Sequence, residues 1–360
     1  MSVHFHKLTV AAVDRETPDC VSITFNIPED LKKVFQYTQG QSLTMKTILN
    51  GEEVRRTYSL CSSPLDNEWK VAVKKAAYGL FSTYANTELK AGDTLDVMEP
   101  VGKFNTTLKP ENKKQYLALA AGSGITPVLS IIKTTLRTEP HSRFTLVYGN
   151  RNHQSILFLE ELEGLKNKYV DRFNLIHVLS RERTDTSINN GRIDANKLTE
   201  LEKLINYAGI DEVFICGPEE LIFTARDFFL QKGMDKKQIH FELFSTQGQR
   251  KPEVELKQTE KINHEVQSSI TIKADGRSFD FFIPQNSKQT ILDAALAQGA
   301  DLPYACKGGM CCTCKAKLLE GKVAMEVHWG LEDEEIENGF ILTCQSHPQT
   351  ERVVVDYDIK

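Results

Sequence analysis

Nine residues near the C-terminus read Cys306-Lys307-Gly308-Gly309-Met310-Cys311-Cys312-Thr313-Cys314, and one more cysteine, Cys344, follows thirty positions later. Five of the eight cysteines of the chain therefore lie within 39 residues. A disulfide scaffold would need cysteines along the rest of the chain, so this clustering indicates metal or redox chemistry. One loop can wrap three thiolates around a metal centre while a distant segment supplies the fourth. Gly308 and Gly309 let the loop backbone come close enough to donate N–H groups to sulfur.

The spacing of these cysteines, C-x4-C-x2-C with a distant fourth, matches that of plant-type ferredoxins, which hold a [2Fe–2S] cluster. The resemblance covers residues 267–360 and includes Leu302-Pro303-Tyr304-Ala305 and Leu342-Thr343, which precede the first and last of these cysteines. It implies an α+β domain of the β-grasp type and a cluster that takes one electron at a time. The implied cluster ligands are Cys306, Cys311, Cys314 and Cys344.

A structural zinc ion is the alternative occupant, because four thiolates also suit its tetrahedral geometry. Zinc modules usually present two pairs of closely spaced ligands, whereas here three ligands are local and the fourth is single, so the sequence favours the cluster. Cys312 stands between two ligand positions, and we do not expect it to bind metal. Cys20 and Cys61 are expected to be small buried hydrophobic residues.

The net charge of -5 is confined to this last part of the chain. Residues 266–360 contain 9 Lys and Arg against 14 Asp and Glu, whereas residues 1–265 contain 35 of each. The acidic excess suggests pairing with a basic protein surface and argues against binding of nucleic acid. A run such as Glu332-Asp333-Glu334-Glu335 is nevertheless more often a solvated helix face.

The remaining residues divide into further regions by their hydrophobic periodicity. Residues 1–110 carry short runs of alternating apolar and polar residues, typical of a small antiparallel β-barrel. Residues 111–247 alternate strand-like and helix-like stretches, which indicates an α/β domain with a parallel sheet whose ligands bind at the carboxyl ends of the strands. Residues 248–266 are polar and without periodicity, and we expect a linker. The strand-like runs of the α/β region are 115–121, 144–148, 173–179, 212–216 and 239–244.

Two short motifs in the barrel region point to a flavin. Arg56-Thr57-Tyr58-Ser59 follows a strand, and Gly79-Leu80-Phe81-Ser82-Thr83 comes about twenty residues later, after a basic strand. In this order, ahead of a nucleotide-type domain, they resemble the R-x-Y-S and G-x-x-S motifs of the ferredoxin–NADP reductase superfamily. Tyr58 alone would be interpreted as a half-buried strand aromatic, but the paired motifs favour the flavin.

A flavin needs an aromatic face against its ring, a polar group where hydride arrives, and a cation with backbone amides for its diphosphate. Tyr58, Ser59, and Arg56 with residues 79–83 can supply these groups. The resemblance implies FAD, with FMN as the alternative. The predicted flavin contacts are Arg56, Thr57, Tyr58, Ser59, Val73, Lys74, Gly79, Phe81, Ser82 and Thr83.

Two glycine turns in the α/β region resemble the nicotinamide site of the same superfamily. Gly122-Ser123-Gly124-Ile125-Thr126 follows an apolar strand and opens a helix, and Cys216-Gly217-Pro218 ends a later strand. A tight glycine turn at a helix N-terminus can bind pyrophosphate. The resemblance places Cys216 near the position of hydride transfer. The predicted nucleotide contacts are Gly122, Gly124, Thr126, Gly217 and Pro218.

The coenzyme is predicted from Ser180 and Arg181, which close the third strand-like run. An acidic residue at this place would favour NADH, whereas Ser with Arg can bind a 2′-phosphate, so we expect NADPH. NADH stays open, because Arg181 can also be a solvated loop residue.

The end of the α/β region, Glu242-Leu243-Phe244, resembles the terminal Glu-x-Tyr of the plant enzymes, whose aromatic ring covers the flavin. Here the aromatic residue is Phe244 and the chain continues beyond it, so its role as a gate for nicotinamide stays open. The resemblance implies that Ser59, Cys216 and Glu242 form the hydride-transfer set.

Taken together, the three regions resemble the reductase components of bacterial multicomponent oxygenases, and among these the phenylacetyl-CoA epoxidase type. The resemblance implies an NAD(P)H-dependent oxidoreductase in which FAD accepts a hydride and the cluster passes single electrons to an oxygenase component, expected to be a di-iron protein. Reductases of Rieske dioxygenases and of membrane desaturases or hydroxylases share this architecture. A redox-sensing binding protein and a zinc-stapled nucleotide-binding protein are the alternatives from other classes.

The location of the chain is also an expectation. The N-terminal residues lack the basic stretch and apolar core of a signal peptide. No apolar run approaches the roughly 18 residues that a membrane-spanning helix needs. We therefore expect a cytoplasmic protein without membrane insertion.

Overall fold

The barrel region forms one antiparallel sheet in a computed structural model that describes residues 4–244, 267–284 and 287–359. The strand order is β4-β3-β6-β1-β2-β5, and a bridge between Leu60 and Val71 joins the two outer strands, so the sheet closes into a barrel. Alternate apolar residues of the strands fill its interior around Phe35 and Trp69. The elements are β1 (Phe5–Thr17), β2 (Cys20–Asn26), β3 (Ser42–Leu49), β4 (Glu52–Ser59), β5 (Trp69–Lys74), β6 (Thr94–Met98) and helix α1 (Leu80–Thr87).

The α/β region forms a five-stranded parallel sheet with the order β11-β10-β7-β8-β9. From β7 the chain adds β8 and β9 on one side, and it then adds β10 and β11 on the other. The boundary between β7 and β10 is therefore the switch point of the sheet, where sheets of this kind bind ligands. The last predicted strand ends one residue early, at Leu243. The strands are β7 (Gln115–Ala121), β8 (Arg143–Asn150), β9 (Phe173–Leu179), β10 (Glu212–Gly217) and β11 (Ile239–Leu243), and the helices are α2 (Ile125–Thr138), α3 (Leu159–Lys168), α4 (Ala195–Leu201) and α5 (Glu219–Gln231).

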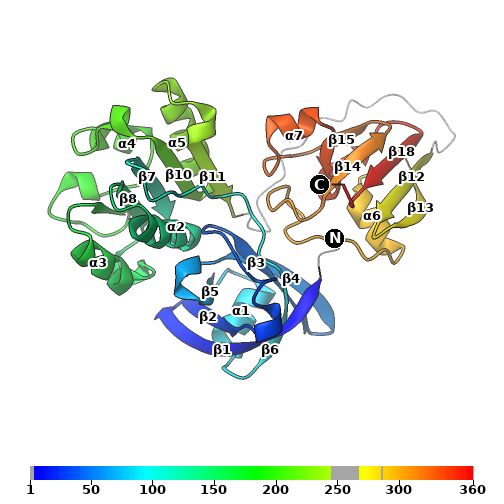
Figure 1. Cartoon of the computed structure of the whole chain (residues 1–360), viewed down its shortest axis with the longest axis horizontal. Helices are drawn as coiled ribbons and strands as arrows, with labels where there is room; N and C mark the ends of the chain where they lie inside the picture. The colour runs from blue at the N-terminus through cyan, green and yellow to red at the C-terminus, as the bar shows by residue number, and fades with distance from the viewer. Residues whose placement is uncertain (1–3, 245–266, 285–286, 360) are drawn as a thin grey trace. The chain divides into compact units, whose positions relative to one another are not determined.

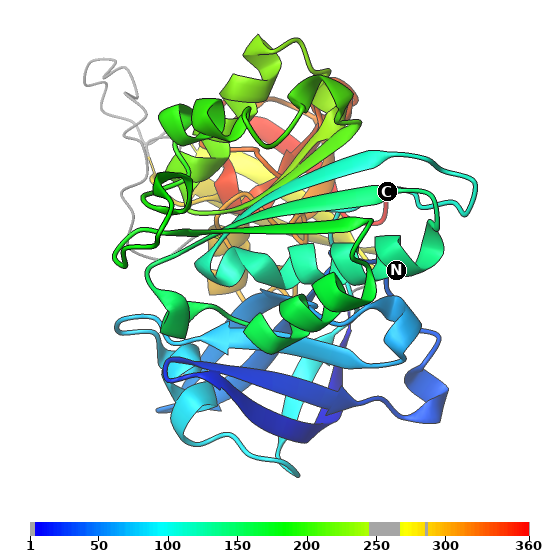
Figure 2. The same cartoon turned by 90° about the vertical axis from the view of Figure 1, so that its left-hand side faces the viewer.

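Helix α2 lies between the parallel sheet and the barrel (Figure 2). Its barrel-facing side is polar: Ser130 Oγ donates to the Ser62 carbonyl at 2.6 Å, and Arg137 donates to Leu65 and to the Asp66 carboxylate. Lys133 pairs with Asp66 at 2.9 Å. Because α2 starts at the first glycine turn, these contacts fix that turn relative to the barrel.

The last region forms a mixed sheet with the order β13-β12-β18-β14-β16. β12 and β18 pair in parallel at its centre, and α6 packs on the sheet, which is the predicted β-grasp arrangement. The hairpin of β12 and β13 turns at Asp275-Gly276, both with positive φ. The elements are β12 (Gln267–Ala274), β13 (Arg277–Pro284), β14 (Lys315–Glu320), β15 (Val323–Met325), β16 (Phe340–Leu342), β17 (Ser346–Pro348), β18 (Arg352–Asp356), α6 (Ile291–Ala297) and α7 (Asp333–Glu337); all except β16 and β17 are labelled in Figure 1.

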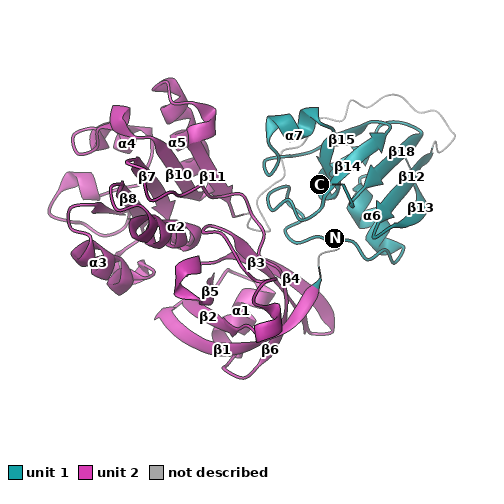
Figure 3. Cartoon of the chain, in the orientation of Figure 1, with its two compact units in different colours: residues 1–4, 245–360 teal, residues 5–244 magenta. Residues whose placement is uncertain are grey.

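The chain forms two compact units (Figure 3). One consists of residues 5–244, so the barrel and the α/β region belong together, and the other contains the elements from β12 onward. The linker predicted for residues 248–266 lies outside the described residues. Within the described ranges, no helix has the length and apolar character that crossing a membrane requires.

Candidate functional site: a flavin and nucleotide cleft, and a cysteine cage

A hydrogen bond joins two of the three predicted hydride-transfer residues. Ser59, the last residue of β4, donates through Oγ to Glu242 Oε2 at 2.8 Å, although 183 positions separate them in the chain. Glu242 lies on β11 and pairs in register with Cys216 on β10. The carboxyl ends of two parallel strands and the end of a barrel strand therefore bring Ser59, Cys216 and Glu242 together.

The protonation of this group is set by burial. Burial raises the pKa of Glu242 to about 7, and the hydrogen bond from Ser59 opposes part of this rise. Burial, with the nearby Glu242 carboxylate, also raises the pKa of the Cys216 thiol, which is fully buried. At neutral pH the site thus holds a neutral thiol and a carboxyl group that can gain or lose a proton.

The two predicted glycine turns touch each other. A Cβ atom placed on Gly124 would lie 2.2 Å from the Cys216 carbonyl oxygen and 2.8 Å from the Gly217 nitrogen. Only glycine permits this approach, since real Cβ atoms do not come so near to backbone. Gly122 has φ of 55°, a conformation that also favours glycine. The contact lies at the switch point between β7 and β10, where a dinucleotide would enter.

The flavin motifs lie next to each other in the barrel. The Tyr58 and Phe81 rings are 5.6 Å apart, with Phe81 fully buried and Tyr58 half-buried. Ser82 Oγ accepts from the Ala76 N–H at 3.1 Å and donates to the Gly79 carbonyl, which shapes the loop before α1. No side chain caps the N-terminus of α1, so its amide groups fit the diphosphate of a flavin.

Three other predicted flavin residues, Val73, Lys74 and Thr57, already make contacts within the barrel. The Val73 side chain lies in the barrel core and its carbonyl accepts from Asn86, so only its backbone is near the surface of the barrel. Lys74 faces Asp19 at 3.6 Å. Thr57 Oγ1 lies 3.0 Å from Thr44 Oγ1 on β3.

The remaining predicted residues lie on β4, in α1, and at the glycine turns before α2 and α5. Arg56 donates to the Arg55 carbonyl, and Thr83 N–H bonds to the Gly79 carbonyl in the first turn of α1. Thr126 Oγ1 donates to the Ser123 carbonyl, and Pro218 precedes α5.

Ser180 and Arg181 follow β9 and are exposed. Their backbone N–H groups bond to Asn150 and Arg151, which places Arg181 beside the end of β8. The neighbouring acidic residue, Glu182, accepts from the His153 N–H at 2.7 Å. Phe244 is half-buried and packs against the apolar cluster that β7, β8 and α2 share.

The four predicted cluster ligands come together as two pairs. Cys306 lies beside Cys311, and Cys314 beside Cys344; the neighbouring thiol lowers the pKa of Cys306 in the first pair and of Cys344 in the second. Among the described residues, no three His, Cys, Asp or Glu side chains surround one point as a single metal ion would require. Two pairs are what two irons need, one pair for each.

Donors around the thiols fit a sulfur-rich group. The Gly308 N–H points at Cys306 Sγ at 3.3 Å, and the Cys306 N–H at Cys311 Sγ at 3.5 Å. Gly309 has φ of 76°, and a Cβ there would meet Val327 at 2.6 Å. Donors of this kind stabilise the charge of a bound iron–sulfur cluster.

Sequence reasoning missed two residues of this cage. Thr313 Oγ1 lies 3.2 Å from Cys311 Sγ, and the buried Gln345 amide donates to the Lys307 carbonyl at 2.9 Å. Each is adjacent in sequence to a predicted ligand, Thr313 to Cys314 and Gln345 to Cys344, and this adjacency could have pointed to them. Cys312, predicted not to be a ligand, donates to the Gly330 carbonyl at 2.5 Å, and Cys20 and Cys61 are buried as predicted.

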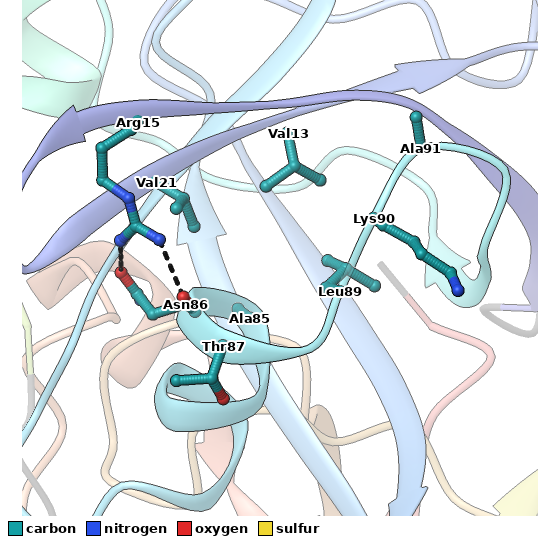
Figure 4. A pocket seen from close by; sticks show the side chains of 9 residues that line it. All are labelled: Val13, Arg15, Val21, Ala85, Asn86, Thr87, Leu89, Lys90 and Ala91. Atoms are coloured by element: carbon teal, nitrogen blue, oxygen red, sulfur yellow. Dashed lines mark hydrogen bonds between the residues drawn. The ribbon is translucent and has the colours of Figure 1, made fainter.

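A cavity of about 330 Å³ opens on the outer side of the barrel (Figure 4). It lies at the C-terminal end of α1, where Arg15 donates to the Asn86 side chain and carbonyl at 3.0 and 2.8 Å. None of the predicted flavin residues lines it. Arg15 instead anchors α1 to β1 through Asn86.

Three domain families match the chain in the order of its folds. They are an oxidoreductase FAD-binding domain at residues 7–106, an oxidoreductase NAD-binding domain at 118–227 and a 2Fe-2S iron-sulfur cluster binding domain at 273–349. One component of the 1,2-phenylacetyl-CoA epoxidase of Escherichia coli strain K12 is 48% identical over 99% of this chain and 98% of its own. The chain belongs to the oxygenase reductases.

Other members of the reductase family are more distant. The ferredoxin reductase component of the 3-ketosteroid-9-alpha-monooxygenase of Rhodococcus rhodochrous is 35% identical over 97% of this chain and 96% of its own. Among solved structures, phthalate dioxygenase reductase aligns with a TM-score of 0.59 over 98% of both chains at 23% identity, which shows a shared fold.

Membership of this family confirms the predicted class and cofactors. The reductase is an NAD(P)H-dependent oxidoreductase with FAD and a [2Fe–2S] cluster, and it is the reductase component of a multicomponent oxygenase. When bound, FAD accepts the hydride and the cluster carries single electrons. The alternatives of a structural zinc ion, a redox-sensing binding protein and a zinc-stapled nucleotide-binding protein are therefore wrong.

Proposed function

We propose that this reductase passes electrons from NADPH, through FAD and the [2Fe–2S] cluster, to a di-iron oxygenase of the phenylacetyl-CoA epoxidase type. The observation that carries the proposal is the 48% identity to the Escherichia coli epoxidase component over essentially both full lengths. The aromatic substrate would bind the oxygenase and not this chain, so no residue here identifies it. The proposed acceptor is therefore taken from the relative.

The residue roles in this proposal follow the geometry of the cleft. Ser59 and Glu242 hold a proton next to the position of the flavin, and the Cys216 backbone and Gly124 shape the nicotinamide side. Cys306 with Cys311, and Cys314 with Cys344, would each hold one iron. The domain bounds that we propose remain 1–110, 111–247 and 267–360.

NADPH is favoured over NADH by charge at the end of β8 and β9. Arg151, Arg181 and Arg183 are all exposed there. Glu182, the acidic residue directly after Arg181, accepts a hydrogen bond from the His153 N–H, and Asp185 follows three positions later. Arginine suits a 2′-phosphate, whereas the ribose hydroxyl of NADH is usually bound by a free carboxylate.

The coenzyme is tested by steady-state kinetics of flavin reduction with NADPH and NADH. Arg181→Ala is expected to raise KM for NADPH by roughly tenfold, from the loss of about 1.5 kcal/mol of charge-assisted bonding, and to leave KM for NADH unchanged. Arg143→Ala, an exposed arginine at the opposite end of β8, is the control. Equal losses with both coenzymes would refute the 2′-phosphate role.

The acceptor is tested by reconstitution. The reductase is mixed with the oxygenase components of a phenylacetyl-CoA epoxidase and, separately, with the oxygenase of a 3-ketosteroid 9α-monooxygenase, since a relative at 35% identity serves that enzyme. NADPH oxidation coupled to epoxide formation with only the first oxygenase supports the proposal. Coupling with only the second would replace the proposed acceptor.

A further inference from the structure

A chain of hydroxyl groups connects the C-terminal residues of the sheet to the cluster cage. Thr343, directly before the ligand Cys344, is fully buried. Its Oγ1 donates to the carbonyl of another ligand, Cys314, at 3.0 Å, and its N–H bonds to the same oxygen at 3.2 Å. The Tyr357 hydroxyl lies 2.6 Å from Thr343 Oγ1.

The direction of these hydrogen bonds follows from counting protons. A carbonyl oxygen only accepts, so the single hydroxyl proton of Thr343 is used on Cys314. Tyr357 must then be the donor to Thr343 Oγ1. The resulting chain runs from Tyr357 to Thr343 to Cys314, with the positive end of each O–H dipole directed toward the ligand pair Cys314 and Cys344.

Tyr357 is held in place from the side away from the cage. Its backbone N–H bonds to the Lys273 carbonyl at 2.8 Å. The next residue, Asp358, accepts from the N–H groups of Asp275 and Gly276 at 2.8 and 2.9 Å. The backbone at Tyr357 is therefore anchored to β12 and to the β12–β13 turn, while its hydroxyl contacts Thr343.

We propose that Tyr357 is a positioning residue for the cluster: its hydroxyl orients Thr343, fixes the Cys314 carbonyl relative to Cys344, and raises the reduction potential of the cluster. Hydrogen-bond chains polarise one another, and donors near a cluster stabilise the negative charge that reduction adds. The proposal rests on the cluster of the family and is independent of the coenzyme and of the acceptor.

The test is a redox titration of the cluster in the full-length holoprotein, followed by electron paramagnetic resonance, without any oxygenase. Tyr357→Phe keeps the ring and removes only the donor. We expect a two- to threefold smaller equilibrium constant for reduction, which is a potential lower by roughly 20 to 30 mV at 59 mV per tenfold. Thr343→Val is expected to lower the potential at least as far, and Thr343→Ser, which keeps the hydroxyl, to retain the native value.

Two controls separate this role from general loosening of the domain. Thr271→Val removes a hydroxyl of the same domain that donates to Asp280 at 2.6 Å, and it should leave the potential unchanged. In the double variant of Tyr357→Phe and Thr343→Val, the potential should equal that of Thr343→Val alone, because the phenol acts through the threonine.

The measured potentials of these variants either support or overturn the role of Tyr357. A native potential in Tyr357→Phe, or an equal shift in Thr271→Val, would overturn it. If Tyr357→Phe does not retain iron, Thr343→Val and Thr343→Ser decide: a native potential in the valine variant overturns the proposal, and a lowered potential in valine but not in serine supports it.

Discussion

Ser59 and Glu242 are a pair whose chemistry depends on where one proton lies. Because burial raises the pKa of Glu242 to about 7, the carboxyl group changes its protonation within the physiological range. The Ser59 hydroxyl donates to the ionised form, so it holds this pKa lower than burial alone would. If Ser59 and Glu242 act in hydride transfer as proposed, we expect reduction of the flavin to depend on pH near neutrality.

Ser59→Ala is expected to slow flavin reduction by roughly ten- to a hundredfold, the effect of losing a hydrogen bond of about 1.5 to 3 kcal/mol to a charged group. It should also move the inflection of the pH profile upward from about pH 7, because the opposing hydrogen bond is gone. Stopped-flow measurement of flavin absorbance from about pH 5.5 to 9 checks both, at about half-unit steps. Glu242→Gln should abolish the inflection.

Ser42→Ala is the matched control for that substitution. Ser42 lies opposite Ser59 in the β3–β4 register and donates to the Val101 carbonyl, away from Glu242. Its variant should keep the native inflection. An inflection that persists in Glu242→Gln would assign the titration to another group.

At the scale of elements, the contact between two glycine turns sets the width of the nicotinamide side. Gly124→Ala would drive a Cβ into the Cys216 carbonyl and push the ends of β7 and β10 apart. Since small displacements of reacting groups cost rate steeply, we expect kcat/KM for NAD(P)H to fall by about tenfold or more. Steady-state reduction of ferricyanide measures this without the oxygenase.

Gly164→Ala serves as the control for a glycine change without a clash. Gly164 is inside α3, and a Cβ there meets nothing within 4 Å. Alanine should leave the kinetics unchanged and stabilise the helix by up to about 1 kcal/mol. A native kcat/KM in Gly124→Ala would contradict this prediction, because it would mean that the two glycine turns can move apart without loss of rate.

The amino ends of β7 and β10, opposite the glycine turns, carry a charged cluster that serves stability. Burial opposes the ionisation of Glu212, but hydrogen bonds from His240 and Lys114 outweigh it and lower its pKa from 4.5 to about 2. The native state thus favours the ionised form, and this contribution is present above pH 4.5 and is lost as the pH falls toward 2. The pKa difference corresponds to about 3 kcal/mol.

Glu212→Gln should therefore lower the free energy of unfolding by about 3 kcal/mol at pH 7, and the difference from the native protein should shrink below pH 4.5. Urea denaturation followed by fluorescence at several pH values measures it. A difference that stays constant down to about pH 3 would mean that packing, and not charge, explains the loss.

The strand-like runs, the type of each sheet and the paired motifs could be predicted from sequence because periodicity and glycine turns are local signals. β7 and β9 begin and end where the strand-like runs predicted for residues 115–121 and 173–179 do. The contacts of α2 with Asp66, and of Tyr357 with Thr343, could not be predicted, because they join residues far apart through side chains that carry no motif. Ser59 and Glu242 are predictable individually from resemblance, but their hydrogen bond needs the fold.

At the scale of the whole molecule, the two compact units divide the chemistry. Residues 5–244 contain the flavin and nucleotide sites, and the cysteine cage lies in the other unit. Loss of the cluster should therefore stop electron delivery without stopping flavin reduction.

Cys344→Ser tests this division in the full chain. We expect loss of the iron absorbance, an unchanged rate of flavin reduction by NADPH, and loss of at least nine-tenths of electron transfer to the oxygenase, roughly tenfold or more. Absorbance spectra, stopped-flow kinetics and coupled turnover measure the three. A variant that retained coupled turnover without iron would mean that the flavin reaches the acceptor directly.

The central position of β18 bears on how the protein is made. This strand lies between β12 and β14, yet the ribosome synthesises it after every other strand of its sheet. The sheet cannot close until residue 356 has emerged, and Tyr357 follows it immediately. Although all four ligand cysteines precede β18, we expect a chain truncated before this strand to reduce its flavin but to hold no iron.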